Sequence, residues 1–217
     1  MQTIDINQWE RQKTYLWFKE FSNSTYGMNV RIDVTKLLKH TREKKESFFI
    51  DLLYIVVKSL DSVEEMRMRL VDGEPVIYDD VTPAYTVMTE AGVFENVRHE
   101  KGNSFKEFYE IASREIESAK KQSEIKKETY HPENCYSEYY ITCVPWADFT
   151  SFKDPIPDDK SSASIPRVCW GKYTEKDGKY ELTMSITVDH MFVDGYPLAM
   201  AFNKIQELLN SPGKYLK

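Results

Sequence analysis

Hydrophobic residues recur every three or four positions in the stretch SFFIDLLYIVVKSL, which covers residues 47–60. This spacing places them on one face of a helix, and we expect that helix to pack against a sheet. A second helix is predicted after Ser104, because Ser104 and Glu107 form the pattern of a capping box and apolar residues follow at helical spacing. A third helix is predicted near the C-terminus, where the apolar residues between Leu198 and Leu209 have the same period.

Short runs rich in β-branched and aromatic residues separate these helices and predict strands. They are VRIDV (30–34), EPVIYD (74–79), AYTVMT (84–89), YYITCV (139–144) and RVCWGKY (167–173). The connections are too irregular for a repeating βαβ pattern, so we predict an α/β fold with a two-layer mixed β-sheet and packed helices. Because the chain has no internal repeat and no Gly/Ser linker, residues 1–217 are expected to form a single domain.

The stretch YELTMSITVDH, residues 180–190, alternates apolar and polar residues as a strand with one buried face does. His190 continues the apolar positions of this pattern. We therefore expect its ring at a strand end, turned toward the apolar side, whereas Asp189 points the other way. Partial burial would disfavour the charged form of the imidazole and keep it available as a base.

The residues after His190 predict a tight turn into a helix. Asp194 suits a helix N-cap, Gly195 permits the turn, and Pro197 is tolerated in the first helical turn. Strand, turn and helix would together hold His190 in place, and a general base needs this rigidity.

Two other interpretations of His190 stay open, since a histidine near a strand end is more often a structural residue than a base. As a metal ligand it would need Asp189 and Asp194 as partners, but Asp189 faces the opposite side of the strand. The remaining histidines are expected in polar surroundings without ligand spacing, and they are His40, His99 and His131. We therefore expect no metal.

The composition of the chain argues against nucleic acid, a membrane and zinc as binding partners. The net charge of -6 and the pI near 5.4 argue against binding to nucleic acid, which needs clustered Lys and Arg. No apolar run approaches the ~20 residues that span a bilayer, and no basic leader begins the chain, so we expect a cytoplasmic protein without membrane contact. Three cysteines without a C-x-x-C pair indicate reduced thiols and no zinc site.

The pattern H-x-x-x-D-G before a C-terminal helix resembles the signature of the chloramphenicol acetyltransferase family. It is also similar to the acyltransferase core of 2-oxo acid dehydrogenase complexes. The resemblance continues in IDINQWERQKTYLWF, RIDVTKLL, VIYDDVTPAYTV, VPWADFTSF and GKY, whose order and spacing favour the chloramphenicol branch. One difference is Asp189, which stands where the antibiotic-modifying enzymes usually carry a second histidine.

The resemblance implies roles for four residues and a co-substrate. His190 matches the histidine that takes a proton from an acceptor hydroxyl as its oxygen attacks the thioester of acetyl-CoA, without an acyl-enzyme. Ser151 matches a hydroxyl that stabilises the tetrahedral oxyanion. Asp194 and Arg11 match an ion pair that anchors the turn carrying the base.

The resemblance also implies an acceptor pocket, and here the chain departs from the family. Trp17 and Phe18 stand where chloramphenicol binders commonly have a Phe-Tyr pair, so a phenolic hydroxyl is missing. Cys169 replaces a common threonine, and Arg167 occupies a position that is commonly apolar. These differences concern the acceptor and leave the acetyl-transfer residues in place.

Two further aromatic residues are candidates for the pocket. Phe149 lies beside Ser151, and Tyr85 follows from its position in PAYTV, although either could simply pack against the sheet. The resemblance implies a homotrimer with active sites at subunit interfaces.

We therefore expect an O-acetyltransferase that acts on chloramphenicol or a similar small molecule and confers antibiotic resistance. Two alternatives are an acyltransferase for another hydroxylated acceptor and a non-catalytic trimeric binding module.

Overall fold

A mixed sheet forms the centre of the protein in a computed structural model that describes residues 1–122 and 135–217. The strand order is β2-β10-β8-β7-β5-β6, and β9 pairs with β10. β7 runs parallel to β5 and β8, whereas the other neighbours are antiparallel, which confirms the predicted mixed α/β fold. The strands are β2 (Thr25–Asp33), β5 (Thr82–Met88), β6 (Phe94–Arg98), β7 (Glu138–Val144), β8 (Arg167–Gly171), β9 (Thr174–Lys176) and β10 (Lys179–Asp189).

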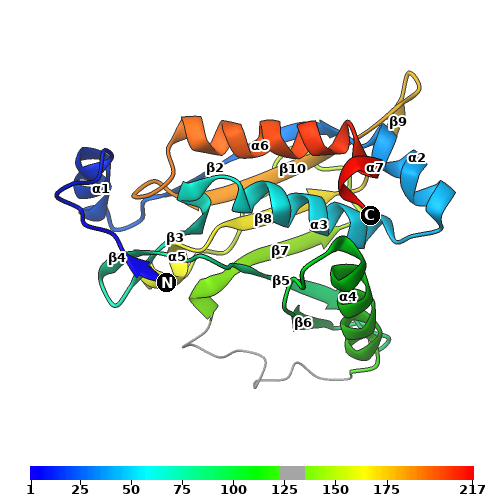
Figure 1. The fold of residues 1–217 in the computed structure, drawn as a ribbon, viewed down its shortest axis with the longest axis horizontal. Helices are drawn as coiled ribbons and strands as arrows, with labels where there is room; N and C mark the ends of the chain where they lie inside the picture. Colours follow the sequence, from blue (N-terminus) through cyan, green and yellow to red (C-terminus); the bar gives the residue numbers. More distant parts are fainter. Residues whose placement is uncertain (123–134) are drawn as a thin grey trace.

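Helices cover one face of this sheet, and α3 and α6 lie side by side across it (Figure 1). The helices are α1 (Gln12–Lys19), α2 (Thr35–Lys44), α3 (Phe48–Asp61), α4 (Phe105–Lys120), α5 (Lys160–Ala163), α6 (Gly195–Leu209) and α7 (Pro212–Tyr215). A small second sheet has the order β1-β4-β3 and consists of β1 (Gln2–Thr3), β4 (Glu74–Ile77) and β3 (Met68–Val71). Among the described residues, no helix combines the length and apolar character needed to cross a bilayer.

The three helices expected from the sequence are present, and polar N-caps begin each of them. Ser104 accepts a hydrogen bond from the Glu107 amide at 3.2 Å, while the Glu107 carboxylate accepts one from the Asn103 amide at 2.8 Å. Ser47 caps α3 and Asp194 caps α6 in the same way. These caps satisfy amides that would otherwise lack partners, which explains why the local sequence locates the helix starts so well.

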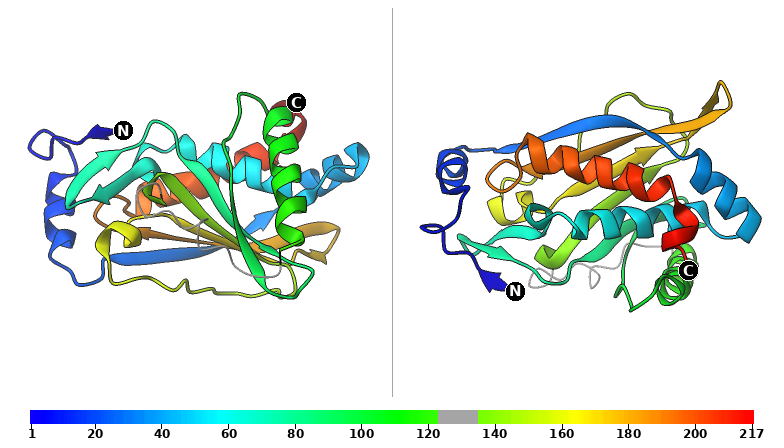
Figure 2. Two further views of the ribbon diagram at one scale, coloured as in Figure 1. Left: turned by 90° about the horizontal axis from the view of Figure 1, so that it is seen from below. Right: turned by 45° about the horizontal axis from the view of Figure 1, so that its top comes forward.

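The opposite face of the sheet is covered by the extended segment of residues 149–157, called the strap below, which runs along the lower edge of the left view in Figure 2. The Thr187 hydroxyl donates to Asp154 at 2.7 Å, and the Phe152 amide donates to the Asn29 side chain at 3.0 Å. Because the strap covers this face, Ser185 is only 1% exposed although it belongs to the polar positions of β10. The expectation that β10 buries one face alone is therefore wrong.

His99 also differs from the expectation, because it lies in the aromatic core and not in polar surroundings. Its ring packs edge-on against Tyr85 and Phe108, at centroid distances of 5.7 and 5.0 Å. Its Nδ1 lies 2.8 Å from the Glu100 carbonyl oxygen, and burial lowers the pKa of the imidazole. The structure places His40 half-buried near Glu46, while His131 lies outside the described residues.

One carboxylate is fully buried within this framework. Asp51 of α3 has no exposed surface and accepts a hydrogen bond from the Thr41 hydroxyl at 2.7 Å. Burial raises its pKa to about 6, and the nearby charge of Glu46 adds to this effect. The charged form of Asp51 is therefore a cost to the folded state at neutral pH.

Replacing Asp51 by Asn should stabilise the protein at neutral pH. A carboxyl group whose pKa rises on folding contributes full stability below about pH 4 and loses it as the pH rises through about 6. We expect the variant to gain about 2 kcal/mol relative to the wild type between pH 4 and pH 8. Urea unfolding at both pH values measures this difference, and an equal gain at pH 4 and pH 8 would contradict the explanation.

Candidate active site

The imidazole of His190 lies between two aromatic rings just beyond the end of β10. Its ring stacks on Phe18 at a centroid distance of 3.9 Å and an interplanar angle of 16°, and Tyr26 lies 4.5 Å away. The His190 amide donates to the Ser24 carbonyl at 2.9 Å, which extends the ladder between β10 and β2 by one bond. Contacts with both rings restrict the rotation of the imidazole, as a positioned base requires.

The two ring nitrogens of His190 have different surroundings. Nδ1 is buried and has no hydrogen-bond partner among the described residues, whereas Nε2 is not buried in this way. Nε2 is therefore the nitrogen that a substrate hydroxyl can reach. Sequence reasoning missed Tyr26, because its contact with His190 depends on the pairing of Tyr26 with Val188 across two strands.

The turn after His190 is anchored by an ion pair between Arg11 and Asp194. The carboxylate of Asp194 also accepts the Tyr196 amide at 3.2 Å and so caps α6. Arg11 makes a second, longer contact of 3.4 Å with Glu65. Both side chains of the Arg11–Asp194 pair are partly buried, which strengthens such a pair relative to a fully exposed one. The structure thus brings together His190, Asp194 and Arg11.

Ser151 does not join this group within one chain. It is exposed at the start of the strap, where the next residue, Phe152, is bonded to Asn29. Asn29 pairs with Ser185 in the middle of β10. His190 lies five residues further along, which is roughly 16 Å at the usual rise of a strand.

The predicted pocket residues have different environments. Trp17 is 68% exposed, next to Phe18, and Phe149 is half-buried against Phe152 at a centroid distance of 5.6 Å. Tyr85 is almost fully buried against Phe49 and His99, and burial raises the pKa of its phenol. Tyr85 also lines the cavity of about 550 Å³ described below, so its position fits both the packing role and the pocket role that the sequence left open.

Cys169 and Arg167 lie on β8 beneath the strap. Cys169 has no exposed surface, and burial raises the pKa of its thiol to about 12, so the thiol stays protonated at neutral pH. Arg167 donates to the carbonyls of Ile165 and Ser162 at 2.8 and 3.0 Å, and its guanidinium lies 5.5 Å from the centre of the Tyr140 ring. These contacts hold Arg167 in the wall of a cavity.

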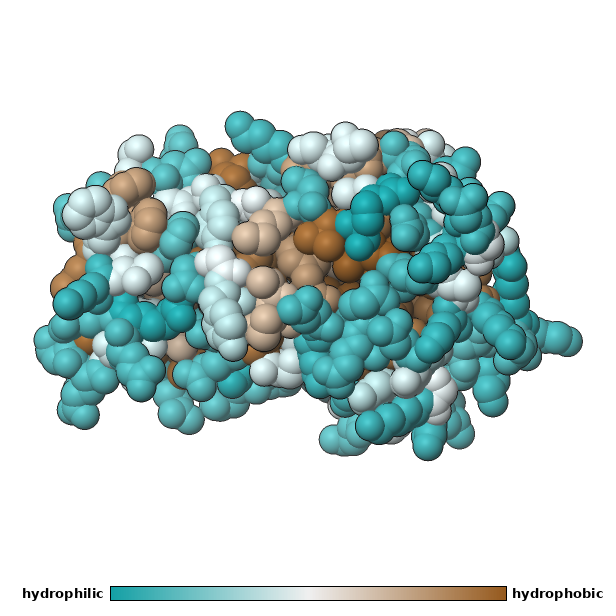
Figure 3. All heavy atoms as spheres, turned by 90° about the horizontal axis from the view of Figure 1, so that it is seen from above, coloured by the Kyte–Doolittle hydropathy of each residue, from teal (hydrophilic) through white to brown (hydrophobic). Residues whose placement is uncertain are grey.

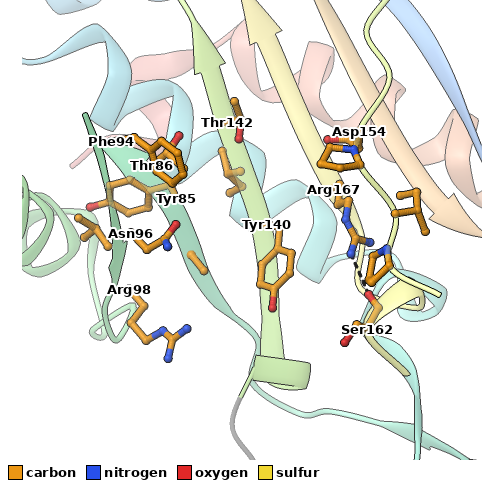
Figure 4. Close-up of a pocket in the computed structure, with 16 residues that line it drawn as sticks. Tyr85, Thr86, Phe94, Asn96, Arg98, Tyr140, Thr142, Asp154, Ser162 and Arg167 are labelled. Atoms are coloured by element: carbon orange, nitrogen blue, oxygen red, sulfur yellow. Dashed lines mark hydrogen bonds between the residues drawn. The ribbon is translucent and has the colours of Figure 1, made fainter. Parts of the chain in front are cut away.

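That cavity has a volume of about 550 Å³ and lies between β5, β6, β7 and the strap (Figure 4). Thr142 and Tyr140 project into it from the same side of β7, and Arg98 and Arg167 stand on either side of Tyr140. The cavity is large enough for a drug-sized molecule. Neither Ser151 nor His190 is among the residues that line it.

A second cavity of about 630 Å³ lies on the helix side of the sheet. Its aromatic walls come from Phe48, Phe49, Trp146, Trp170 and Tyr173. Lys120 and Lys172 also line it and supply positive charge.

Thr86 of β5 lines both cavities. The reason lies in the strand pairing, because β5 pairs with β7 only as far as Tyr85 opposite Ile141. Beyond that point β5 remains paired with β6, and β7 remains paired with β8. The two strands therefore separate, and the two cavities approach each other through the sheet.

His190 lines neither cavity within one chain. The nearer wall of the 550 Å³ cavity is at Arg167, which pairs with Thr187, three residues before His190. Three residues of a strand span roughly 10 Å. The described part of the chain also contains no group of three or more His, Cys, Asp or Glu side chains that could hold a metal ion.

Known proteins resemble the chain over nearly its whole length. The family model for chloramphenicol acetyltransferase matches residues 1–206. The chain is 28% identical over 207 residues to a chloramphenicol acetyltransferase of Escherichia coli, an alignment that covers 94% of this chain and 92% of that protein. It is 27% identical over 219 residues to a chloramphenicol acetyltransferase of Staphylococcus aureus, with 98% and 97% of the two chains covered.

Solved structures show the same relationship. A chloramphenicol acetyltransferase superimposes with a TM-score of 0.88 at 25% identity, over 96% of this chain and 99% of that chain. The dihydrolipoamide acetyltransferase of Azotobacter vinelandii superimposes with a TM-score of 0.70 at 16% identity, over 94% and 88% of the chains, which shows a shared fold. Together with the match over residues 1–206, these similarities confirm the resemblance expected from the sequence and indicate an acyltransferase. The chain belongs to the chloramphenicol acetyltransferase family.

Proposed function

We propose that the protein is an O-acetyltransferase that moves an acetyl group from acetyl-CoA to a hydroxyl of chloramphenicol or a similar small molecule. The observation that carries this proposal is the imidazole of His190, held between Phe18 and Tyr26 above a turn that Arg11 and Asp194 anchor. Membership of the family supports the donor and the reaction class. A role in antibiotic resistance, which the family implies, and a cytoplasmic location belong to the same proposal.

In the proposed reaction, Nε2 of His190 takes the proton of the acceptor hydroxyl as its oxygen attacks the thioester carbonyl of acetyl-CoA. A tetrahedral intermediate forms, with its negative charge on the former carbonyl oxygen. Collapse of the intermediate breaks the carbon–sulfur bond, and the proton passes from His190 to the CoA sulfur. The products are the acetyl ester and CoA, without an acyl-enzyme and without a metal.

The 630 Å³ cavity has the chemistry needed for acetyl-CoA. Rings such as those of Trp146 and Tyr173 can stack on an adenine base, and Lys120 and Lys172 can pair with phosphate groups. The 550 Å³ cavity on the other face is the proposed acceptor site. Because Thr86 borders both cavities, a thioester that enters from the helix side can meet an acceptor that enters from the strap side.

We propose that the protein works as a homotrimer in which His190 faces the acceptor cavity of a neighbouring subunit. The separation of His190 from both cavities within one chain supports this arrangement. Apolar side chains reach the surface in the middle of the face seen in Figure 3, and hydrophilic side chains dominate its right end. Large side chains are also exposed in the segments before and after the base, namely Leu16, Trp17, Phe21 and Tyr196, as a subunit contact would require.

Two hydroxyls are candidates for the oxyanion donor. The family resemblance proposes Ser151, which is exposed on the strap. Thr142 of β7 also carries a hydroxyl, lines the acceptor cavity and lies next to Ile141, the last residue of β7 that pairs with β5. A donor acts only if its hydroxyl oxygen lies about 3 Å from the developing oxyanion, so the two sites can be told apart by mutation.

A different hydroxylated acceptor is the second candidate function, and two residues favour it. Phe18 lacks the phenolic hydroxyl that the family resemblance leads one to expect for chloramphenicol binders. Arg167 places a guanidinium in the wall of the acceptor cavity, where the resemblance leads one to expect an apolar side chain. A non-catalytic binding module is less consistent with the structure, because such a module would not need a sandwiched imidazole with an anchored turn.

His190→Ala should lower the acetyl-CoA turnover roughly a thousandfold, because the base is lost while both cavities remain. CoA thiol release, followed colorimetrically with and without chloramphenicol, measures the effect. Thermal unfolding and acetyl-CoA binding of the same variant serve as controls and should stay close to the wild type. Acceptor-dependent thiol release that survives the substitution would remove His190 from the mechanism.

Thr142→Val and Ser151→Ala should separate the two oxyanion candidates, because each removes a hydroxyl with little change in shape. We expect a loss of about a hundredfold in kcat for Thr142→Val, with KM nearly unchanged, and a change of less than threefold for Ser151→Ala. The opposite ranking in steady-state kinetics would assign the donor to Ser151, as the resemblance proposes.

Phe18→Tyr tests whether the missing hydroxyl limits the use of chloramphenicol. A restored hydrogen bond is worth about 1 kcal/mol, so kcat/KM for chloramphenicol should rise about fivefold. Thiol release with a second, unrelated hydroxylated acceptor is the control. Unchanged efficiency with chloramphenicol would favour the candidate function with another acceptor.

A further inference from the structure

Ser24 makes two hydrogen bonds with the end of β10. The Ser24 hydroxyl donates to the Asp189 carboxylate at 2.7 Å. The Ser24 carbonyl accepts the amide of His190 at 2.9 Å. One residue of the connection between α1 and β2 thus binds two consecutive residues of the strand end, and this double contact is called the Ser24 clamp below.

The same carboxylate also shapes the turn that carries His190. Its Oδ1 atom accepts the Met191 amide at 2.8 Å, and the Asp189 carbonyl accepts the amides of Phe192 and Val193 at 3.2 and 3.0 Å. Asp189 therefore organises the turn through both its side chain and its main chain. The turn is fixed on one side of His190 by Asp189 and on the other by the Arg11–Asp194 pair.

The Ser24 clamp also sets the position of the rings around the imidazole. Ser24 leads directly into β2, where Tyr26 pairs with Val188 and packs against His190. On its other side, the connection begins at the end of α1, which carries Phe18. Loosening the clamp would therefore change the spacing between the imidazole and both rings.

Asp189 is a charged group in an apolar setting. It is 2% exposed, and burial raises the pKa of its carboxyl group. The charged or titratable groups that face it are Lys160 from α5, Tyr15 from α1 and the adjacent His190. Lys160 is held in place by donating to the Lys19 carbonyl at 2.6 Å. Because water hardly reaches Asp189, its hydrogen bonds with Ser24 and Met191 are the contacts that hold its side chain.

We propose that Asp189 is a positioning residue for His190, whose hydrogen bonds with Ser24 and Met191 hold the imidazole in place for acetyl transfer through the Ser24 clamp. The catalytic part of this inference rests on the proposed function. The geometry of the clamp stands without it. Asp189 is the residue at which the chain departs from the histidine that the family resemblance leads one to expect.

Asp189→Ala removes the acceptor of both hydrogen bonds and should lower kcat by about tenfold with both KM values unchanged. Asp189→Asn should restore kcat to within about threefold of the wild type, since the amide oxygen can still accept from Ser24 and Met191. Ser24→Ala removes one half of the clamp and should lower kcat by about fivefold. Asp51→Asn is the matched control, because it changes a buried carboxylate remote from the site, and its kinetics should equal those of the wild type.

A second readout does not depend on turnover. The ring proton signals of His190, recorded by NMR at one fixed pH, should shift in Asp189→Ala because the contacts of the ring with Phe18 and Tyr26 change, and they should stay close to the wild type in Asp189→Asn. Wild-type kcat and unchanged ring signals in both Ser24→Ala and Asp189→Ala would overturn the clamp. Absence of thiol release by the wild type would refute the proposed function, and the ring signals would still decide on the clamp.

Discussion

The antiparallel pairing of β2 with β10 determines where the reactive histidine lies. The ladder runs without interruption from Glu181 opposite Asp33 to Asp189 opposite Thr25, and the His190 amide adds one more bond to Ser24. A shift of this register by one residue would turn every side chain of β10 to the other face. It would also separate the imidazole from Tyr26. The position of His190 therefore depends on the register of the sheet more than on the conformation of any loop.

The parts of the fold that depend on local sequence could be predicted. The helices α3, α4 and α6 begin where Ser47, Ser104 and Asp194 cap them, because a capping side chain bonds to amides only two or three residues away. The mixed sheet followed from the irregular connections between short apolar runs. The turn after His190 was also readable, since Gly195 and Pro197 have strong local preferences.

The parts that depend on distant contacts could not be predicted. The strap buries Ser185 on a face that the alternation of β10 marks as polar, because a segment far along the chain covers it. Tyr26 and Ser24 meet His190 through strand pairing that no local pattern reveals. Ser151 and Thr142 both carry a hydroxyl and lie in or beside the stretch VPWADFTSF. The sequence does not distinguish them as oxyanion donors, whereas in the structure Thr142 lines the acceptor cavity and Ser151 does not. The family resemblance implied the catalytic roles of the residues, and the tertiary structure gave their contacts and distances.

The separation of β5 from β7 has a consequence for the order of events during turnover. Under the proposed function, the donor and the acceptor approach the sheet from opposite faces and meet beside Thr86. Neither molecule then blocks the entrance or the exit of the other. Binding and release can then occur in either order. The occupancy of each site depends on its own affinity and not on whether the other substrate has already bound.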